Sequence, residues 1–390
     1  MLFINATIFT MEKKEPDKNS YLQIIDGKFA AIGEMSDTLP QDDCIIDIGG
    51  KSIYPGFIDA HTHVGMFDDG LCFEGDDGNE DSDPSTPHLR AVDAVNSFDR
   101  CFSEAANAGV TSVLTGPGSS NPIAGQIAAV KTHGRYLDEM IIKAPIAMKM
   151  SLGENPKTTY SEKGESPVTR MATAAVIREQ LFKTKRYLEE IEASEAGDGD
   201  APEADFKCNA LMSVLKGELP VHFHCHRRDD IITAMRIAKE FNLKYTLVHA
   251  TEGYMIADIL SENDVSVLSG PTLCDRSKPE LANLSPAATG ILDKNGVKAG
   301  IITDHPVIPI QYLPLCAGLC VREGMDETAA LKAITINPAC ICGIDDRVGS
   351  IKVGKDADFT VFFQNPLLLS AKPDAVYING KKVFDRNETK

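Results

Sequence analysis

Short runs of alternating apolar and polar residues occupy both ends of the chain. Residues 2–9 form one such run, and residues 21–32 form two more around an Asp-Gly-Lys turn. Near the C-terminus, a run at residues 359–363 precedes another at residues 375–384, which is interrupted by Asn-Gly. Alternation with a period of two is typical of β-strands, and Asn-Gly is a favoured turn between the strands of a hairpin. Both ends of the chain are therefore predicted to be β-rich.

The middle of the chain has a different pattern, in which short apolar runs alternate with amphipathic helical stretches. The clearest helical stretches are residues 169–191, 229–241 and 327–334. Strands that alternate with helices are typical of parallel βα units. Eight apolar runs are interpreted as strands, and they end at His61, Thr115, Lys131, Met150, Cys225, His249, Ser269 and Asp304. Their number predicts a (β/α)₈ TIM barrel, a fold of the α/β class.

These patterns predict two domains. Residues 55–345 are expected to form the barrel. Residues 1–54 and 346–390 are expected to form a small β-sandwich domain beside it, because the two β-rich ends can meet and share one core. A chain of 390 residues is long enough for one barrel with an appendage of this size.

Composition and charge narrow the range of partners and compartments. The formal net charge of -18 argues against binding of nucleic acid, which requires basic clusters, and the sequence has none of useful size. No run approaches the ~20 apolar residues needed to cross a membrane. The first residues lack the basic start and apolar stretch of a secretory signal. The 10 cysteines have no paired spacing. We therefore expect reduced thiols in a cytoplasmic protein.

The histidines are the candidate metal-binding residues. His61 and His63 end the first predicted barrel strand, where side chains two residues apart point to the same side and can share a metal ion. Solvated histidines at a polar strand end would give the same pattern for this pair alone. However, seven of the nine histidines lie at or beside predicted strand ends, which is where barrel enzymes place their chemistry. This distribution predicts a metal centre.

The chain resembles the metal-dependent amidohydrolase superfamily, especially its imidazolonepropionase-related and dihydropyrimidinase-like branches. The resemblance rests on Pro55–His63, the strand around His224, His249, Thr303-Asp304, Asn337–Ala339, Gly349–Ile351 and Gly354–Asp358. It covers nearly the whole chain. It implies a hydrolase that acts on carbon–nitrogen bonds with one or two divalent metal ions, and zinc is the default for a histidine-rich site.

The resemblance implies the metal ligands residue by residue. His61 and His63 would bind the more buried ion, and Asp304 would complete its shell. His224 and His249 would bind the second ion.

The resemblance also implies a bridge between the ions and a catalytic base. Lys149 would carry a carbamate made from CO₂ and bridge the two ions, with Glu154 as the rival bridging ligand. A solvent-facing lysine is the alternative for Lys149. Asp304 would take a proton from metal-activated water and pass it to the leaving nitrogen. As a strand-terminal aspartate it can alternatively cap the next helix.

Substrate-binding residues are expected just beyond the strand ends. His226 would lie nearer the substrate than His224, whereas His222 would lie deeper and pack structurally. Arg227 and Arg276 follow strands five and seven, where a guanidinium can bind a carboxylate. For each arginine, an ordinary surface or salt-bridged position is the favoured interpretation.

These residues lead to one main functional hypothesis and two alternatives. The main hypothesis is hydrolysis of a carbon–nitrogen bond in a small-molecule amide, cyclic amide or dipeptide-like substrate. A single-metal deaminase of the same superfamily would not need the Lys149 bridge. A non-catalytic dihydropyrimidinase-like scaffold would be expected to lose ligands that this sequence keeps. A homo-oligomer is expected on general grounds.

Overall fold

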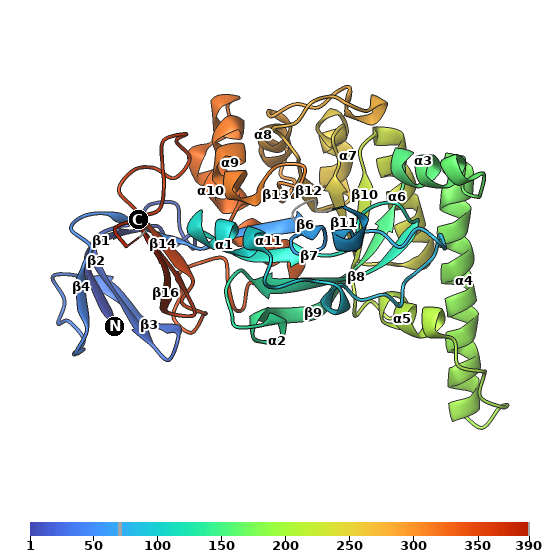
Figure 1. Ribbon diagram of the computed structural model, residues 1–390, viewed down its shortest axis with the longest axis horizontal. Coiled ribbons are helices and arrows are strands. Elements are labelled where there is room, and N and C mark those ends of the chain that lie inside the picture. The colour runs from blue at the N-terminus through green and yellow to red at the C-terminus, as the bar shows by residue number, and fades with distance from the viewer. Residues whose placement is uncertain (69–71, 389–390) are drawn as a thin grey trace.

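The computed structural model describes residues 1–68 and 72–388, which form two eight-stranded sheets with flanking helices (Figure 1). Residues 389 and 390, the last two of the predicted small domain, lie outside the described residues. One sheet is built from the two ends of the chain and lies at one end of the molecule, opposite helix α4 (Arg170–Glu195). Within the described residues, no helix is both long enough and apolar enough to span a membrane.

The terminal sheet joins the two ends of the chain through β5 (Ser52–Pro55) and β14 (Phe359–Phe362), which pair antiparallel. Its order is β16-β15-β14-β5-β1-β2-β3, and β4 pairs with β1. Its other strands are β1 (Leu2–Ile8), β2 (Asp17–Ile25), β3 (Lys28–Glu34), β4 (Ile45–Asp47), β15 (Ala375–Ile378) and β16 (Lys381–Asp385). The sandwich packing, and the domain boundaries at 54/55 and 345/346, stay predictions.

The second sheet is a nearly closed barrel, in the order β13-β12-β11-β10-β9-β8-β7-β6, with β13 lying against β6. Its strands are β6 (Phe57–Thr62), β7 (Val110–Thr115), β8 (Ile123–Lys131), β9 (Ile141–Ser151), β10 (Val221–Cys225), β11 (Tyr245–His249), β12 (Val267–Ser269) and β13 (Ala299–Ile301). The fold is therefore mixed α/β with an eight-stranded barrel sheet, as the sequence predicts.

One strand departs from the predicted (β/α)₈ pattern. β8 runs antiparallel to both β7 and β9, so the prediction of eight parallel strands is wrong at the third strand. The physical reason is the short connection: residues 116–122 separate β7 from β8, whereas a parallel crossover needs about a dozen residues. Lys131, at the end of β8, therefore lies at the end of the barrel opposite the other strand termini.

The helices cover the barrel, and the three predicted from the sequence are α4, α6 (Arg228–Phe241) and α10 (Glu327–Ala333). Thr169 caps α4, because its side chain accepts a hydrogen bond from the Ala172 N–H. The other α-helices are α1 (Arg100–Asn107), α2 (Leu137–Met140), α3 (Glu154–Lys163), α5 (Phe206–Leu215), α7 (Ala257–Glu262), α8 (Ala288–Lys294), α9 (Leu313–Arg322) and α11 (Ile336–Cys342).

A buried ion network connects the barrel to the segment that enters the terminal sheet. Lys131 is 2% exposed and contacts both Asp358 and Asp356, with 3.1 Å from its Nζ to the Asp356 carboxylate. Lys28 and Arg347 also contact Asp356, at 3.1 and 2.7 Å. This charge cluster fixes the last strands of the chain against the end of the barrel opposite the predicted site.

Candidate active site

The first part of the candidate site forms where β6 and β13 end. His61 lies on β6, His63 is the first residue after β6, and Asp304 lies three residues beyond the end of β13. The Asp304 Oδ1 atom lies 3.3 Å from His61 Nε2 and 3.4 Å from His63 Nε2. The two imidazoles therefore face one carboxylate, as their spacing on the strand predicts.

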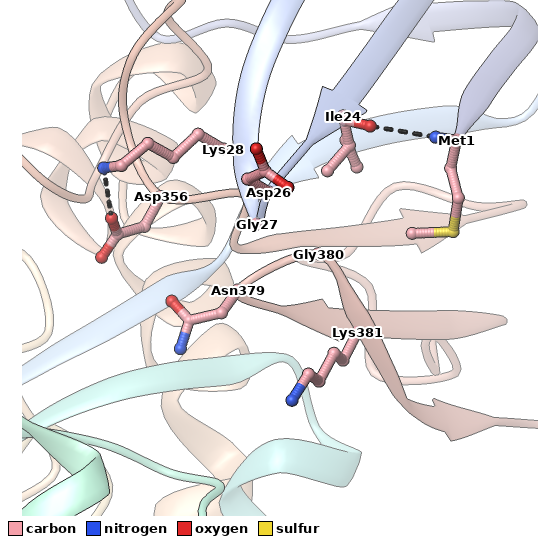
Figure 2. Close-up of a pocket in the computed structure, with 9 residues that line it drawn as sticks. All are labelled: Met1, Ile24, Asp26, Gly27, Lys28, Asp356, Asn379, Gly380 and Lys381. Carbon is pink, nitrogen blue, oxygen red and sulfur yellow. Dashed lines mark hydrogen bonds and ion pairs between the residues drawn. The ribbon is translucent and has the colours of Figure 1, made fainter. Parts of the chain in front are cut away.

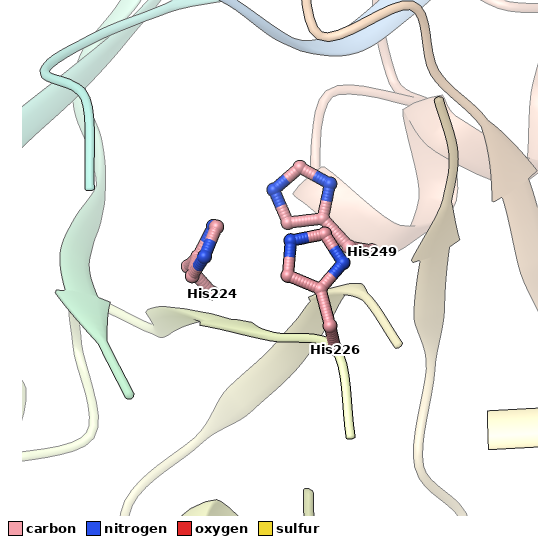
Figure 3. A group of neighbouring side chains, drawn as sticks. All are labelled: His224, His226 and His249. Carbon is pink, nitrogen blue, oxygen red and sulfur yellow. The ribbon is translucent and has the colours of Figure 1, made fainter. Parts of the chain in front are cut away.

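The second part of the site contains His224 of β10 and His249 of β11, which Figure 3 shows together with His226. The His224 and His249 ring centroids are 4.6 Å apart and the rings are inclined at 77°. His249 also lies 5.1 Å, centroid to centroid, from His61. Histidines from strands nearly two hundred residues apart thus meet in one buried cluster.

Hydrogen bonds at Nδ1 orient three of these rings. The His63 Nδ1–H donates to the Gly116 carbonyl at 2.7 Å, and the His249 Nδ1–H donates to the Gly270 carbonyl at 2.8 Å. His224 Nδ1 lies 2.9 Å from the Ser119 hydroxyl. The Nε2 atoms of His224 and His249 are buried and have no hydrogen-bond partner among residues 1–68 and 72–388. Fixing one ring nitrogen while leaving the other free is the arrangement of a metal-binding histidine.

Gly270 is required where it makes this contact. Its φ is +149°, and a Cβ at this position would lie 2.3 Å from the Ile302 carbonyl oxygen. His249 and Asp304 themselves have φ values of 70° and 56°, which are uncommon for residues other than glycine. Backbone strain of this kind is concentrated at functional sites.

Lys149 points into the same cluster. It lies on β9 opposite His222 of β10, is fully buried, and places its Nζ 3.3 Å from His61 Nε2. Burial lowers the pKa of Lys149 to about 8, partly opposed by Asp304. With this pKa, about a tenth of Lys149 is neutral at pH 7, compared with less than about a thousandth for an ordinary lysine. The neutral amine is the form that reacts with CO₂, so the environment of Lys149 fits the predicted carbamate.

Glu154 occupies a different position. It begins α3, and its backbone N–H donates to Glu280 at 3.1 Å. Within the described residues, neither of the two convergent sets of His, Cys, Asp and Glu side chains contains Glu154. Lys149 is therefore the better placed of the two predicted bridging ligands.

The charge state of the cluster suits metal binding. Burial lowers the pKa of His61 to about 3 and holds the pKa values of His224 and His249 well below the usual range. Burial also opposes the charged form of Asp304, but its interactions with His249, His61 and His63 outweigh burial, so the pKa of Asp304 lies well below the usual range. Neutral imidazoles and a charged carboxylate are the forms that bind a divalent ion.

Two sets of ligand atoms converge closely enough to hold an ion. In each set all ligand atoms lie within 4.8 Å of one another, and the sets are His61, His249 and Asp304, and His224, His226 and His249. Nitrogen and carboxylate donors of this kind fit zinc and its neighbours among the transition metals. The donor set of this chain therefore fits the predicted metal.

The three predicted substrate-binding residues differ in position. His226 is buried beside His249, with the two rings stacked at 4.5 Å. Arg227 is partly exposed and pairs with Asp229 at 2.7 Å. Arg276 is exposed and donates to the Leu284 carbonyl at 3.0 Å. The structure thus brings only His226 into the histidine cluster.

Asp59 is a residue of the site that the sequence analysis missed. It is fully buried on β6, and burial raises its pKa to about 7. Its Oδ2 accepts hydrogen bonds from the Thr303 hydroxyl at 2.6 Å and from the Thr303 N–H at 3.0 Å. The available signal was its position two residues before His61, on the same face of the strand. Glu280, which faces His226, was also missed, and its place in a loop gave no signal.

A hollow of about 570 Å³ in the terminal sheet is separate from this cluster (Figure 2). It is lined by the turn between β2 and β3, by Met1, by Asp356 and by residues 379–381. Its charged contact is Lys28 with Asp356 at 3.1 Å. No histidine lines this hollow, so we place the candidate metal site in the barrel.

Comparison with known proteins identifies the class. Residues 52–383 match the amidohydrolase family, and the chain therefore belongs to this family, as the sequence motifs predicted. The crystal structure of an amidohydrolase from Thermotoga maritima MSB8 has a TM-score of 0.95 and 40% identity, covering 99% of this chain and 100% of that chain. Enzymes of this family hydrolyse carbon–nitrogen bonds.

Two curated relatives are more distant. Amidohydrolase tasK of Hapsidospora irregularis is 28% identical over 372 residues, which cover 89% of this chain and 38% of tasK. Imidazolonepropionase of Thermoplasma acidophilum is 25% identical over 350 residues, covering 85% of this chain and 80% of that enzyme. This chain spans little more than a third of the length of tasK. Any activity or substrate assigned to this chain is therefore a proposal.

Proposed function

We propose that the chain hydrolyses a carbon–nitrogen bond in an amide, cyclic amide or dipeptide-like small molecule, using one or two divalent ions. The observation that carries this proposal is the convergence of His61, His249 and Asp304 within 4.8 Å, with Lys149 3.3 Å from His61. A buried lysine among neutral histidines has no evident structural purpose, whereas a carbamate on Lys149 would be a bridging oxygen ligand.

Each residue of the site would have a distinct role in metal binding or proton transfer. His61, His63 and Asp304 would hold one ion, and His224 and His249 the other, with Lys149 between them. A bound zinc ion would supply a water of lowered pKa and polarise the scissile carbonyl. Asp304, held in its charged form, would take the proton from that water and deliver it to the leaving nitrogen.

The other residues of the site would orient these groups. Ser119 and the carbonyls of Gly116 and Gly270 would fix the ring orientations through Nδ1. Asp59 would hold Thr303, and through it the backbone that carries Asp304. His226 would contact the substrate. Substrate contacts by Arg227 and Arg276, a homo-oligomeric state and a cytoplasmic location stay predictions.

A single-metal deaminase is the second candidate. His61, His249 and Asp304 by themselves offer three convergent ligand atoms, so one ion could be held without the bridge. The two candidates differ in their product, because a deaminase releases ammonia from an amino-substituted carbon whereas an amidohydrolase of the proposed kind releases an acid and an amine.

The test is a turnover screen with the purified protein. N-acyl amino acids, dipeptides, hydantoins and lactams would be assayed for hydrolysis, and amino-substituted heterocycles for ammonia release. In parallel, Asp304→Asn should keep the fold but lower kcat by roughly 10²- to 10⁴-fold, because the base is lost. Full activity in that variant would refute the assigned base.

A further inference from the structure

His226 belongs by distance to one of the two convergent sets, but the orientation of its ring does not suit sharing an ion with His249. The two rings are stacked, with centroids 4.5 Å apart and planes inclined at only 15° (Figure 3). An ion lies about 2 Å from a nitrogen and close to the plane of the ring that binds it. Two stacked, nearly parallel rings therefore do not direct lone pairs at one point. The His224 ring, inclined at 77° to His249, does converge with it.

The two nitrogens of His226 face different partners. Nδ1 lies 2.7 Å from the Thr251 hydroxyl, which makes a good hydrogen bond. Nε2 lies 3.7 Å from Glu280 Oε1, which is beyond hydrogen-bond distance. Glu280 comes from Pro279–Leu281, a 3₁₀ turn in the segment that follows β12.

Glu280 carries a buried oxygen that lacks a donor. The residue is 1% exposed, and its Oε2 accepts the Glu154 N–H at 3.1 Å. Its Oε1 has no hydrogen-bond partner among the described residues. Burial raises the pKa of Glu280, so a cation bound at Oε1 would stabilise its carboxylate form. Leaving a buried carboxylate oxygen unpaired costs several kcal/mol in stability by order of magnitude, so such an oxygen at a site is usually satisfied by a ligand.

No lysine or arginine in the described part of the chain forms an ion pair with Glu280. Lys278 is the nearest lysine in sequence, but its ammonium donates to the Asn155 side chain at 2.6 Å. Arg170 donates to the neighbouring Asp230 carboxylate at 2.9 Å. Among the described residues, His226 alone comes within ion-pair distance of Glu280.

We propose that Glu280 Oε1 and His226 Nε2 form a subsite for a positively charged nitrogen of the substrate, such as an ammonium group beside the amide to be cleaved. An ammonium has several N–H donors and can donate to His226 Nε2 and Glu280 Oε1 at once. The two atoms are 3.7 Å apart, so they cannot form a direct hydrogen bond with each other in either tautomer of His226. The net charge of -18 also favours the approach of a cation. This inference rests on the proposed function, because it names the substrate class of the same site.

The test compares binding of two matched probes, L-alaninamide, which carries an ammonium, and N-acetyl-L-alaninamide, which does not. Calorimetry would use metal-loaded protein that carries Asp304→Asn, so that turnover does not interfere. We expect tighter binding of L-alaninamide by at least about 10-fold, which corresponds to ~1.4 kcal/mol. Adding Glu280→Gln should abolish this preference, because the charge at Oε1 is lost.

The control variant is Glu240→Gln, which removes the same charge from an exposed position that pairs with Arg178. It should keep the preference. If Glu280→Gln is poorly folded, Glu280→Asp keeps the charge but withdraws it by one methylene, and the preference should fall without vanishing.

Three results would overturn the subsite: equal binding of the probes to the parent protein, a preference retained in Glu280→Gln, or loss of bound metal in Glu280→Gln, which would make Glu280 a ligand. Selective binding without turnover of any substrate in the screen would contradict the proposed function alone. Turnover without selective binding would contradict the subsite alone.

Discussion

Asp59 holds Thr303 by two hydrogen bonds, from the Thr303 hydroxyl at 2.6 Å and from its N–H at 3.0 Å. The pair closes the barrel between β6 and β13 directly beneath the metal ligands. Asp304, the next residue, has a φ of 56°, a conformation that needs support from its surroundings. Asp59 thus connects the strand of His61 to the backbone of the proposed base.

Replacing Asp59 should therefore weaken the site without removing a ligand. Thr303 donates two hydrogen bonds to Asp59 Oδ2, and the His61 N–H donates to Oδ1 at 3.3 Å. Asp59→Asn turns one of these acceptor oxygens into a donor, so the side chain cannot accept all three hydrogen bonds. We expect metal affinity or kcat to fall by about 10- to 100-fold, as for other residues that orient metal ligands. Thr303→Ser keeps both donors and should behave nearly as the parent. An Asp59→Asn protein with unchanged metal affinity and kcat would show that Asp59 does not position Asp304.

Lys131 and Lys28 contact the same aspartate, but replacing them should lower the free energy of unfolding by very different amounts. Lys131→Met leaves Asp358 buried without its cation, whereas Asp356 keeps Lys28 and Arg347. The loss should cost about 3–5 kcal/mol of unfolding free energy. Lys28→Met removes a side chain that is 54% exposed and should cost less than about 1 kcal/mol. Urea unfolding of both variants measures the difference. Equal losses would contradict the assigned role of Lys131.

The buried histidines predict that the metal-free protein loses stability in mild acid. Burial lowers the pKa values of His61 and His226 to about 3 each, whereas an unfolded histidine titrates near 6.5. Between those values the unfolded chain binds protons that the folded chain does not. Stability is therefore fully present above about pH 6.5 and falls as the pH drops toward 3, by up to ~1.4 kcal/mol per pH unit for each such group.

This pH dependence can be assigned with one variant. Urea unfolding of the metal-free protein at pH 7.5 and 5.5 measures the decline, and His226→Gln should reduce it because one titrating group is removed. A decline of the same size in the variant, or stability that rises in acid, would be inconsistent with a neutral buried His226.

Lys149 separates the two candidate functions. Lys149→Ala removes the proposed bridge, so we expect loss of one of two bound metal ions and most of the hydrolytic rate. Lys143 lies on the same strand with its side chain exposed, and Lys143→Ala should change neither quantity. Metal content by mass spectrometry and the rate on the best substrate are the readouts. Unchanged metal and rate in Lys149→Ala would favour the single-metal deaminase.

The sequence predicted the parts of the site that depend on strand periodicity. His61 and His63 share a face because they are two residues apart, and His224 and His249 end neighbouring parallel strands. Such relations follow from local geometry, which the hydrophobic pattern encodes. The family motifs then named Lys149 and Asp304, whose convergence depends on barrel closure.

Other features depend on contacts that no local pattern records. The apolar run that became β8 gives no strand direction, and only the short connection at residues 116–122 indicated the reversal. Glu280 reaches the histidine cluster from a loop, and its partner His226 lies more than fifty residues earlier in the chain. The arginine predictions rested on position after a strand, which does not fix where a long side chain points.

The most direct test of the account is the metal content per chain of the purified protein, measured by inductively coupled plasma mass spectrometry. The protein should hold about two divalent ions, as two-metal hydrolytic sites do, and a His61→Asn, His249→Asn double variant that remains folded should hold none. A parent protein that binds no metal when zinc is supplied, or a double variant that binds as much as the parent, would contradict the account.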